Sequence, residues 1–165
     1  MSERQLFLDC DGVLADFERG AHDVLGMGVD AYVQRHGLGK FWAQLARAPD
    51  FYARLPLLPG ATELFEAVRH LDPVILTGLP RGNWAAGQKV KWAEQHFPGT
   101  RIITCMAVDK RKHAHPGDVL VDDMAKHRRP WEEAGGIFIH HRNSADTLRQ
   151  LAEYFPELRN NVAGD

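Results

Sequence analysis

The chain has 165 residues, of which 44% are hydrophobic and 25% charged, a composition typical of one globular domain with a sizeable core. Its formal net charge of -2 excludes a strongly basic nucleic-acid-binding surface, and no apolar stretch approaches the roughly 18 residues that span a membrane. The N-terminal segment lacks the long apolar core of a signal peptide, and two cysteines, Cys10 and Cys105, suit free thiols better than a disulfide framework. The sequence therefore predicts a cytoplasmic protein.

Five short apolar segments predict the strands of one sheet. They are residues 6–9, 74–77, 101–104, 118–121 and 137–140. Each is apolar throughout rather than alternating, which is typical of strands that are buried on both faces. The segments between them repeat apolar residues at helical spacing, over 61–71, 84–97, 124–134 and 144–154. Alternating strands and helices predict an α/β fold, a Rossmann-like parallel sheet with helices on both faces.

Residues 16–58 interrupt this alternation, because they contain no clear strand and are too long for a simple crossover connection. Glycines and prolines divide them into helical or irregular pieces. We expect them to form a small helical cap, inserted after the first strand and packed over one end of the sheet. The core domain then comprises residues 1–15 and 59–160, and the tail from residue 159 onward is expected to be frayed.

Polar side chains follow four of the predicted strands at the point where each strand ends. They are Asp9 and Asp11, then Thr77 and Gly78, then Thr104 with Lys110 and Lys112 in the next loop, and finally Asp122 and Asp123. Because the carboxyl ends of parallel strands meet at one edge of a sheet, these groups are expected to lie together. Clustered carboxylates repel one another unless a cation lies between them, and oxygen ligands favour Mg²⁺. The pattern predicts a magnesium site that includes Asp9, Asp122 and Asp123.

The same edge suits the transfer of a phosphoryl group. An aspartate that is not fully used as a metal ligand can attack phosphorus and form an aspartyl phosphate. Asp11 follows Asp9 by two positions, points to the same side, and could act as acid and base. Thr77 and a lysine could hold the phosphoryl oxygens and spread their charge. Since an alkoxide leaving group needs a proton and a halide does not, the second aspartate favours hydrolysis of a phosphate ester.

These residues resemble the four motifs of the haloacid dehalogenase-like (HAD) phosphatase superfamily. The stretch DCDGV is similar to the first motif, VILTG to the second, the lysine loop to the third, and VLVDD to the fourth. Each motif alone is weak, but here all four occur in order and each lies at a strand end. The stretches DGVLADFE, LPLLPGA, KVKWAEQHF and PGDVLVDD also resemble the 5'(3')-deoxyribonucleotidase branch, which carries a small helical cap after the first motif.

The resemblance implies a role for each aspartate. Asp9 would be the nucleophile and a magnesium ligand. Asp11 would be the general acid and base, and its backbone carbonyl would also bind the metal. Asp122 and Asp123 would supply the remaining metal contact, and which of the two binds the ion directly stays open.

The resemblance also implies the phosphate-binding groups. Thr77 and Gly78 would bind the phosphate, together with a catalytic lysine. Lys110 lies in an Asp-Lys dipeptide that resembles that of the family, whereas Lys112 has the commoner spacing from the acidic pair. Lys110 is favoured because the HPG stretch before Asp118 resembles a local loop extension.

Aromatic residues in or next to the expected cap could form the substrate pocket. Phe17, Phe41 and Trp42 could stack on a nucleobase, although a small helical insertion also needs a core of its own. The basic run at 126–129 fits a solvated helix face, or it could attract an anionic substrate.

The expected function is that of a magnesium-dependent phosphatase that hydrolyses a 5'- or 3'-(deoxy)ribonucleotide through an aspartyl phosphate. Alternatives are a phosphatase of another small metabolite, such as a sugar phosphate, and a non-catalytic phosphate-binding module on the same fold. The expected partner is a small phosphomonoester, with no nucleic-acid polymer and no membrane. The nine histidines follow no familiar zinc spacing, and the Cys105–Arg111 stretch lacks the glycine of a cysteine-phosphatase loop.

Overall fold

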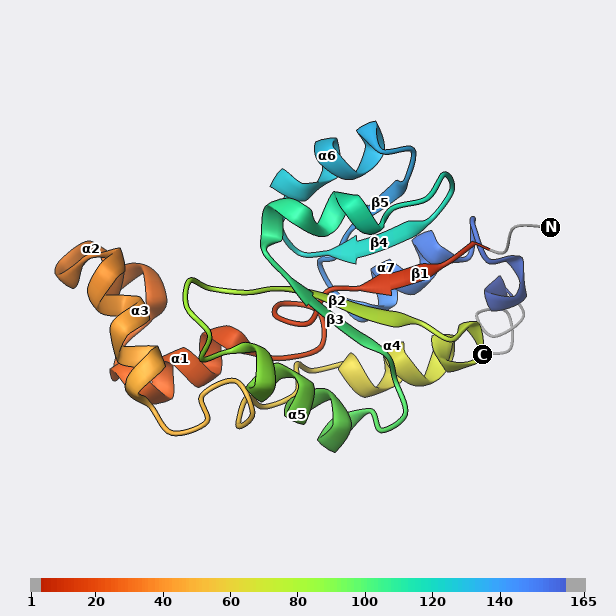
Figure 1. Ribbon diagram of the computed structural model, residues 1–165. Coiled ribbons are helices and arrows are strands. Elements are labelled where there is room, and N and C mark those ends of the chain that lie inside the picture. The colour runs from red at the N-terminus through yellow and green to blue at the C-terminus, as the bar shows by residue number, and fades with distance from the viewer. Residues whose placement is uncertain (1–3, 160–165) are drawn as a thin grey trace.

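The computed structural model describes residues 4–159 and places one five-stranded sheet at the centre of the molecule (Figure 1). The strands are β1 (Leu6–Leu8), β2 (Val74–Gly78), β3 (Ile102–Cys105), β4 (Val119–Asp122) and β5 (Ile137–His140). Their order is β3-β2-β1-β4-β5, and every neighbouring pair is parallel. The predicted α/β fold is therefore confirmed. The tail that was expected to be frayed lies, from residue 160 onward, outside the described residues.

The strands are largely apolar because each of them contributes to two hydrophobic cores, one on each face of the sheet. Leu6 and Leu8 of β1 belong to the larger core, which also contains side chains of α4, α5 and α7. Phe7, between them, belongs to the smaller core, where it contacts Trp131 edge to face at 5.5 Å between ring centroids. Alternate residues of one strand thus point to opposite faces, and both faces are covered.

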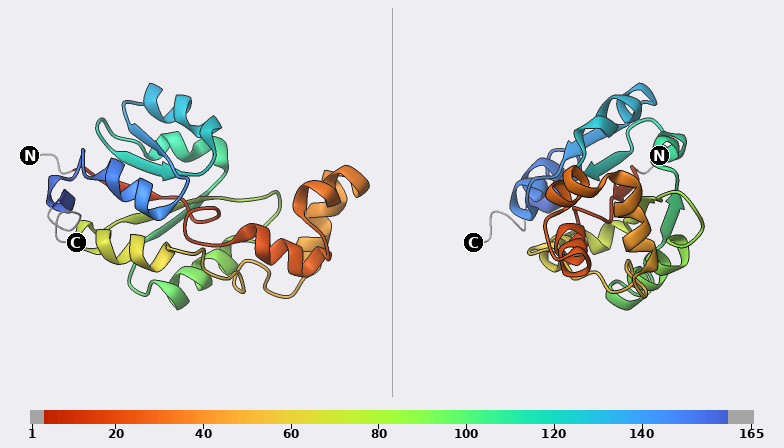
Figure 2. Two further views of the ribbon diagram at one scale, coloured as in Figure 1. Left: turned by 180° about the vertical axis from the view of Figure 1, so that it is seen from behind. Right: turned by 90° about the vertical axis from the view of Figure 1, so that its left-hand side faces the viewer.

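Helices cover the two faces of the sheet, as two further views show (Figure 2). They are α4 (Ala61–Val68), α5 (Ala86–His96), α6 (Arg128–Glu133) and α7 (Ser144–Leu151). Four short 3₁₀ helices complete the described core: η1 (Arg69–Leu71), η2 (Ala107–His113), η3 (Ala125–His127) and η4 (Pro156–Leu158). The apolar periodicity predicts the α-helices but not η2, which carries the lysine loop.

Three helices lie together beyond the carboxyl ends of the strands, at the left of Figure 1. They are α1 (Phe17–Leu25), α2 (Val29–His36) and α3 (Leu38–Arg47). The side chain of Asp16 caps α1 by accepting a hydrogen bond from the backbone N–H of Arg19 at 3.1 Å. After α3 the chain returns along α5, where the indole N–H of Trp92 donates to the Leu55 carbonyl at 2.8 Å. The division of the chain into core and cap domains stays a prediction.

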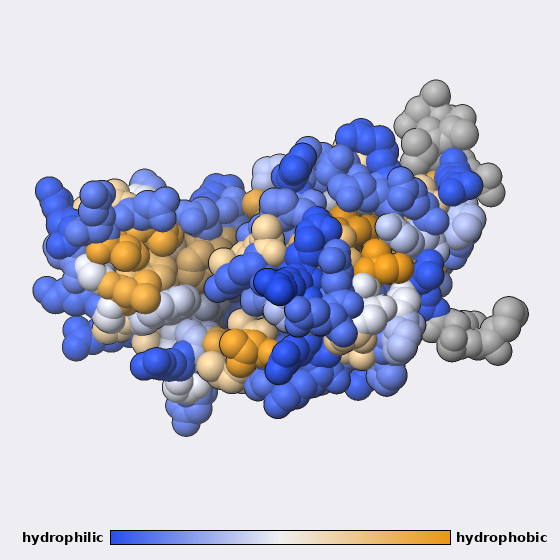
Figure 3. Space-filling model, turned by 90° about the horizontal axis from the view of Figure 1, so that it is seen from above, coloured by the Kyte–Doolittle hydropathy of each residue, from blue (hydrophilic) through white to orange (hydrophobic). Residues whose placement is uncertain are grey.

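Seen from above, hydrophobic side chains gather on the surface of these three helices, whereas hydrophilic side chains dominate the middle of the molecule (Figure 3). Leu38, for example, is 58% exposed. Among residues 4–159, no helix is both long enough and apolar enough to cross a membrane.

Candidate active site

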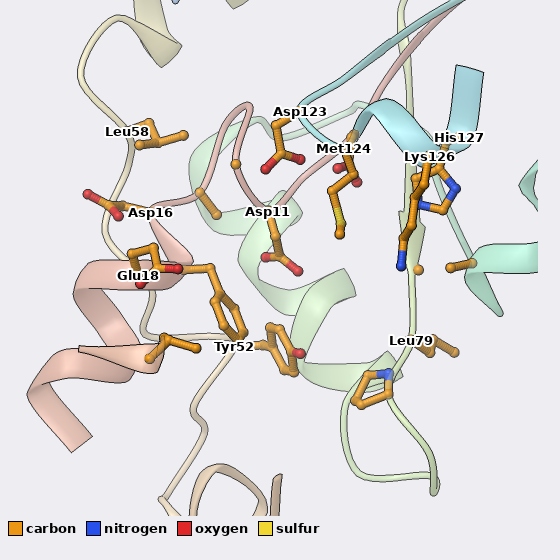
Figure 4. Close-up of a pocket in the computed structure, with 18 of the residues that line it drawn as sticks. Asp11, Asp16, Glu18, Tyr52, Leu58, Leu79, Asp123, Met124, Lys126 and His127 are labelled. Carbon is orange, nitrogen blue, oxygen red and sulfur yellow. The ribbon is translucent and has the colours of Figure 1, made fainter. Parts of the chain in front are cut away.

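A cavity of about 540 Å³ opens between the carboxyl ends of the strands and the three N-terminal helices (Figure 4). Most of the predicted site residues line it, namely Asp9, Asp11, Phe17, Phe41, Trp42, Gly78, Lys110 and Asp123. Thr77 and Asp122 are fully buried and lie outside this lining. The residues at the ends of β1, β2 and β4 and Lys110 therefore lie at one edge of the sheet as expected, whereas Thr104 and Lys112 do not line the cavity.

A tight turn after β1 directs the first two aspartates into the cavity. The carbonyl of Cys10 accepts hydrogen bonds from the backbone N–H groups of residues 13, 14 and 15, at 3.2, 2.8 and 2.9 Å. Because the chain turns here, Asp9 and Asp11 both line the cavity. Cys10, between them, is 2% exposed and belongs to the larger core.

Gly12 is required at this turn for two reasons. Its φ of +84° lies in the region that residues with a Cβ rarely adopt. A Cβ at this position would also overlap the carboxylate of Asp123, which follows β4. The turn after the first strand and the acidic pair after the fourth can therefore meet only because residue 12 has no side chain.

Lys110 lies between two of the buried carboxylates. Its Nζ donates to Asp9 Oδ1 at 3.0 Å and to Asp122 Oδ2 at 2.9 Å. Burial by itself lowers the pKa of Lys110, but the two carboxylates outweigh burial and raise the pKa, so the ammonium stays charged. Lys112, the other lysine considered, has a side chain that is 69% exposed and pairs with Asp109 at 3.0 Å. Of the two lysines, only Lys110 lies at the cavity.

The carboxylates of Asp9, Asp122 and Asp123 form a cluster suited to a divalent cation. One oxygen from each lies within 4.8 Å of the others. Burial raises the pKa of Asp9, with a further contribution from Asp122. Burial and the charges of Asp9 and Asp122 raise the pKa of Asp123 to about 8. Lys110 pairs with two of these three carboxylates, and an oxygen-only donor set with an excess of negative charge is what a hard divalent cation prefers.

Lys89 of α5 is a site residue that the sequence patterns do not identify. It is 1% exposed, and its Nζ donates to Asp11 Oδ2 at 2.8 Å, to Thr77 Oγ1 at 2.7 Å and to the Gly78 carbonyl at 2.9 Å. The ammonium also lies 4.5 Å from the centre of the Tyr52 ring, a cation–π contact. Lys89 therefore connects the end of β2 to Asp11.

One signal in the sequence points to Lys89. It precedes Trp92 and Ala93 by three and four positions, and these two residues form the buried face of α5. A lysine on a buried helix face needs an anionic partner, because an unpaired buried charge is costly. That partner is Asp11, which lies 78 positions away in the sequence.

Asp11 combines burial with an incomplete set of hydrogen bonds. Burial raises the pKa of its carboxyl, Lys89 opposes this, and Asp9 adds to it. Its Oδ1 is buried without a hydrogen-bond partner among the described residues. A carboxyl whose pKa is raised in a cavity is suited to donating and accepting a proton.

The predicted aromatic residues pack on one another and line the cavity at the same time. The Phe17 ring lies 6.3 Å from that of Phe41, 6.2 Å from that of Trp42 and 6.1 Å from that of Tyr52. Phe41 is only 3% exposed, so most of its surface packs inside the helical segment. The two interpretations of these residues, as a core and as a pocket wall, are therefore compatible.

Several residues at the cavity were not among the predicted site residues. They include Asp16, Glu18, Val29, Leu58, Leu79, Pro80, Met124, Lys126 and His127. Figure 4 shows Lys126 and His127 side by side, on the side of the cavity opposite Asp16 and Glu18. The basic run at 126–129 was the available signal, and two of its four members line the cavity.

Comparison with known protein families finds one match over most of the chain. The model of the family described as "5' nucleotidase, deoxy (Pyrimidine), cytosolic type C protein" matches residues 4–152. The chain is 28% identical over 141 residues to the 5'(3')-deoxyribonucleotidase, cytosolic type, of Homo sapiens, covering 72% of this chain and 70% of that protein. It is also 28% identical over 141 residues to the mitochondrial 5'(3')-deoxyribonucleotidase of Mus musculus, covering 72% of this chain and 64% of that protein.

Solved structures share the fold at lower sequence identity. A hydrolase from Streptococcus pneumoniae superimposes with a TM-score of 0.57 at 13% identity, covering 93% of this chain and 100% of that one. A HAD family hydrolase from Deinococcus radiodurans, solved with bound phosphate and sodium, gives a TM-score of 0.56 at 18% identity, and the match covers 91% of this chain and 95% of that one. These likenesses identify the fold as that of the HAD hydrolases.

Proposed function

This chain belongs to the 5' nucleotidase, deoxy (pyrimidine), cytosolic type C family, and we propose that it hydrolyses a 5'- or 3'-(deoxy)ribonucleotide to a nucleoside and phosphate. The observation that carries the proposal is the meeting of Asp9, Asp11 and Lys110 at one cavity. A nucleophile, a proton donor and a fixed cation are the three groups that hydrolysis of a phosphomonoester requires.

In the first half of the reaction, Asp9 attacks phosphorus. Lys110 and the Cys10 backbone N–H both donate to Oδ1 of Asp9, so Oδ2 is the oxygen that would attack. A bond forms between this oxygen and phosphorus while the bond from phosphorus to the ester oxygen breaks. Asp11 gives its proton to that ester oxygen, so the product leaves as a neutral alcohol.

In the second half, water hydrolyses the aspartyl phosphate. Asp11, now a carboxylate, takes a proton from the attacking water, and the bond between Asp9 and phosphorus breaks. Phosphate leaves, and both aspartates return to their starting states. The raised pKa of Asp11 suits both halves, because the same carboxyl must be protonated first and deprotonated next.

The acidic cluster would hold Mg²⁺ in this reaction. Asp9 and the pair Asp122 and Asp123 would bind it through carboxylate oxygens, and Asp11 through its backbone carbonyl. The bound ion would neutralise charge on the transferring phosphoryl group. Lys110, which contacts Asp9 Oδ1 at 3.0 Å, would add a second positive charge beside the nucleophile.

The shape and lining of the cavity favour a nucleotide. Its volume of about 540 Å³ lies within the range of about 300–1,000 Å³ that small-molecule sites occupy. Phe17 and Trp42 provide aromatic surface on which a base could stack. A sugar phosphate is the second candidate substrate, and it would leave this aromatic surface unused. A non-catalytic phosphate-binding module is a poorer fit, because it has no need for a paired Asp11 and Lys89.

A panel of phosphoesters tests the proposal. Purified protein with Mg²⁺ should release phosphate from an aryl phosphate and faster from 5'- or 3'-deoxynucleotides than from sugar phosphates. Asp9→Asn should abolish release, whereas Asp109→Asn, which removes an exposed carboxylate paired with Lys112, should not. Absence of phosphate release from every ester in the presence of Mg²⁺ would refute the enzymatic function.

The cytoplasm stays the expected compartment. The two relatives are named for different compartments, one cytosolic and one mitochondrial, so the comparison does not decide between them.

A further inference from the structure

A second cavity, of about 340 Å³, adjoins the candidate active site. Its lining comprises Ala107, Val108, Lys110, Arg111, Leu120, Lys126, His127, Pro130 and Trp131. Four of these residues, Ala107, Lys110, Lys126 and His127, line the first cavity as well. The two cavities therefore share a wall, and Lys110 lies at that wall together with two basic side chains from the segment after β4.

The two cavities share three basic residues but differ in their carboxylates. Five carboxylates line the first, those of Asp9, Asp11, Asp16, Glu18 and Asp123. The second is lined by two lysines, an arginine and a histidine, and its lining contains no carboxylate. Its floor consists of apolar side chains from the smaller core, Leu120 and Trp131, which strengthen electrostatic attraction by excluding water.

Apart from Lys110, which pairs with Asp9 and Asp122, the lysine and the arginine of this cavity have no ion pair among residues 4–159. Arg128 and Arg129 follow Lys126 closely in the sequence, and they pair with Glu132 at 3.3 Å and Glu133 at 3.1 Å.

The same contrast holds in the lysine loop. Lys112 pairs with Asp109 at 3.0 Å, whereas its neighbour Arg111, which lines the cavity, has no ion pair among residues 4–159. Lys126 likewise has no ion pair within the described part of the chain. Within the described residues, Arg111 and Lys126 thus line the cavity without an ion pair, whereas the neighbouring cations outside its lining, Lys112, Arg128 and Arg129, are each paired with a carboxylate.

We propose that the second cavity binds a second phosphate group of the substrate, so that the enzyme prefers nucleosides phosphorylated at two positions, such as nucleoside 3',5'-bisphosphates. This inference rests on the proposed function, because it places the reacting phosphate of the same molecule at Asp9. Lys110 is already neutralised by Asp9 and Asp122, so Arg111 and Lys126 supply the charge for the second phosphate. His127 adds a ring nitrogen at the shared wall.

A phosphate is the ligand that this arrangement favours. It carries up to two negative charges and several acceptor oxygens, and it can receive hydrogen bonds from a guanidinium and an ammonium at once. A single carboxylate would satisfy only part of this donor set. The shared wall allows both phosphates of one molecule to be bound, one on each side of Lys110.

The test compares kcat/KM for thymidine 3',5'-bisphosphate with kcat/KM for the 3'- and 5'-monophosphates. The wild-type enzyme should prefer the bisphosphate. In the double variant Arg111→Ala/Lys126→Ala, the ratio of kcat/KM for the bisphosphate to kcat/KM for the monophosphates should fall about tenfold, because each charge-assisted contact raises this ratio by a few-fold. The matched control is Lys112→Ala/Arg129→Ala, which removes the same net charge from the same two segments outside the cavity and should change the preference less than about twofold.

Two outcomes would overturn the inference. One is an equal loss of preference in both double variants, which would indicate general electrostatic attraction. The other is a wild-type enzyme that does not prefer the bisphosphate but whose monophosphate turnover responds to millimolar sulfate, a response removed only by Arg111→Ala/Lys126→Ala. That result would assign the cavity to a free anion.

Calorimetry measures nucleotide binding independently of hydrolysis, so it tests this inference separately from the proposed function. If no ester is hydrolysed, the proposed function fails, and binding of the three nucleotides to the wild-type protein decides the inference. Tighter binding of the bisphosphate that is lost in Arg111→Ala/Lys126→Ala supports the second phosphate site. Equal affinity for the bisphosphate and the monophosphates overturns it.

Discussion

Lys89 provides the sharpest test of the site as the structure describes it. Replacing it by Met keeps a long, unbranched side chain inside α5 but removes the ammonium that contacts Asp11, Thr77 and the Gly78 carbonyl. The Asp11 carboxylate then keeps no cation within contact distance, and the buried Thr77 hydroxyl loses its donor.

The expected loss in free energy of unfolding follows from the burial of this ion pair. Removing one partner of a buried ion pair typically costs about 3–5 kcal/mol, because the other charge is left uncompensated. The Asp11 side chain is 25% exposed and can recover some hydration, so the loss should lie near the lower end, about 3 kcal/mol of the free energy of unfolding. Activity should fall as well, because Asp11 loses the contact that orients it.

Lys91→Met is the matched control. Lys91 lies on the same helix, two positions further along, but it is exposed. The same substitution there should change the free energy of unfolding by less than about 0.5 kcal/mol.

The pH dependence gives the prediction a second readout. Burial raises the pKa of Asp11 and Lys89 opposes the rise, so removing Lys89 raises this pKa further. A carboxyl whose pKa is higher in the folded than in the unfolded protein stabilises the fold below its unfolded pKa of about 4, and this contribution is lost as the pH rises through the folded pKa. The loss in free energy of unfolding caused by Lys89→Met should therefore be largest near neutral pH and should shrink as the pH falls toward about 4.

Urea unfolding followed by tryptophan fluorescence measures these differences. Adding Asp11→Asn to Lys89→Met should restore part of the lost stability, because it removes the uncompensated charge. Equal stability of Lys89→Met and Lys91→Met, or no recovery in the double variant, would refute the ion pair and the role assigned to Lys89.

Three further predictions follow from the site. Asp11→Asn should lower kcat/KM for a nucleotide by about 10²–10⁴ but much less for an aryl phosphate with a good leaving group, and an equal loss for both substrates would contradict a proton-donor role. Lys110→Met should abolish most phosphate release, whereas Lys112→Met should leave it nearly unchanged, and the reverse result would assign catalysis to the other lysine. Gly12→Ala should lower activity at least tenfold and destabilise the fold by about 1–2 kcal/mol, measured by the same unfolding assay, because its φ of +84° is unfavourable and the added Cβ would displace Asp123. Unchanged activity in that variant would show that the turn and the acidic pair do not need to meet.

The sequence predicts the sheet and the edge at which its polar residues meet, because both depend on local pattern. A strand buried on two faces is apolar along most of its length, and the five short segments meet that condition except at their ends. Once the strands are parallel, their carboxyl ends share an edge, so Asp9 and the Asp122–Asp123 pair must come close even though more than a hundred positions separate them.

The sequence alone does not determine which partners the charged groups of long side chains contact in the folded protein. Lys110 and Lys112 differ by two positions, and only the winding of η2 buries the first against Asp9 and leaves the second exposed. A 3₁₀ segment of this kind has no apolar periodicity by which it could be recognised. For the same reason, nothing in the basic run at 126–129 indicates that Lys126 lines a cavity while Arg129 pairs on the surface.

Thr77 and Lys89 show most clearly what tertiary structure adds. The strand-end position of Thr77 predicts that its hydroxyl binds phosphate, yet in the folded chain that hydroxyl accepts a hydrogen bond from Lys89. This contact depends on how α5 packs against the end of β2, and that packing is set by apolar residues elsewhere on the helix, such as Trp92. Sequence periodicity determines which faces of the elements are buried. Only the packed fold determines which charged group a buried lysine contacts, because that group is near the lysine in space but distant from it in the sequence.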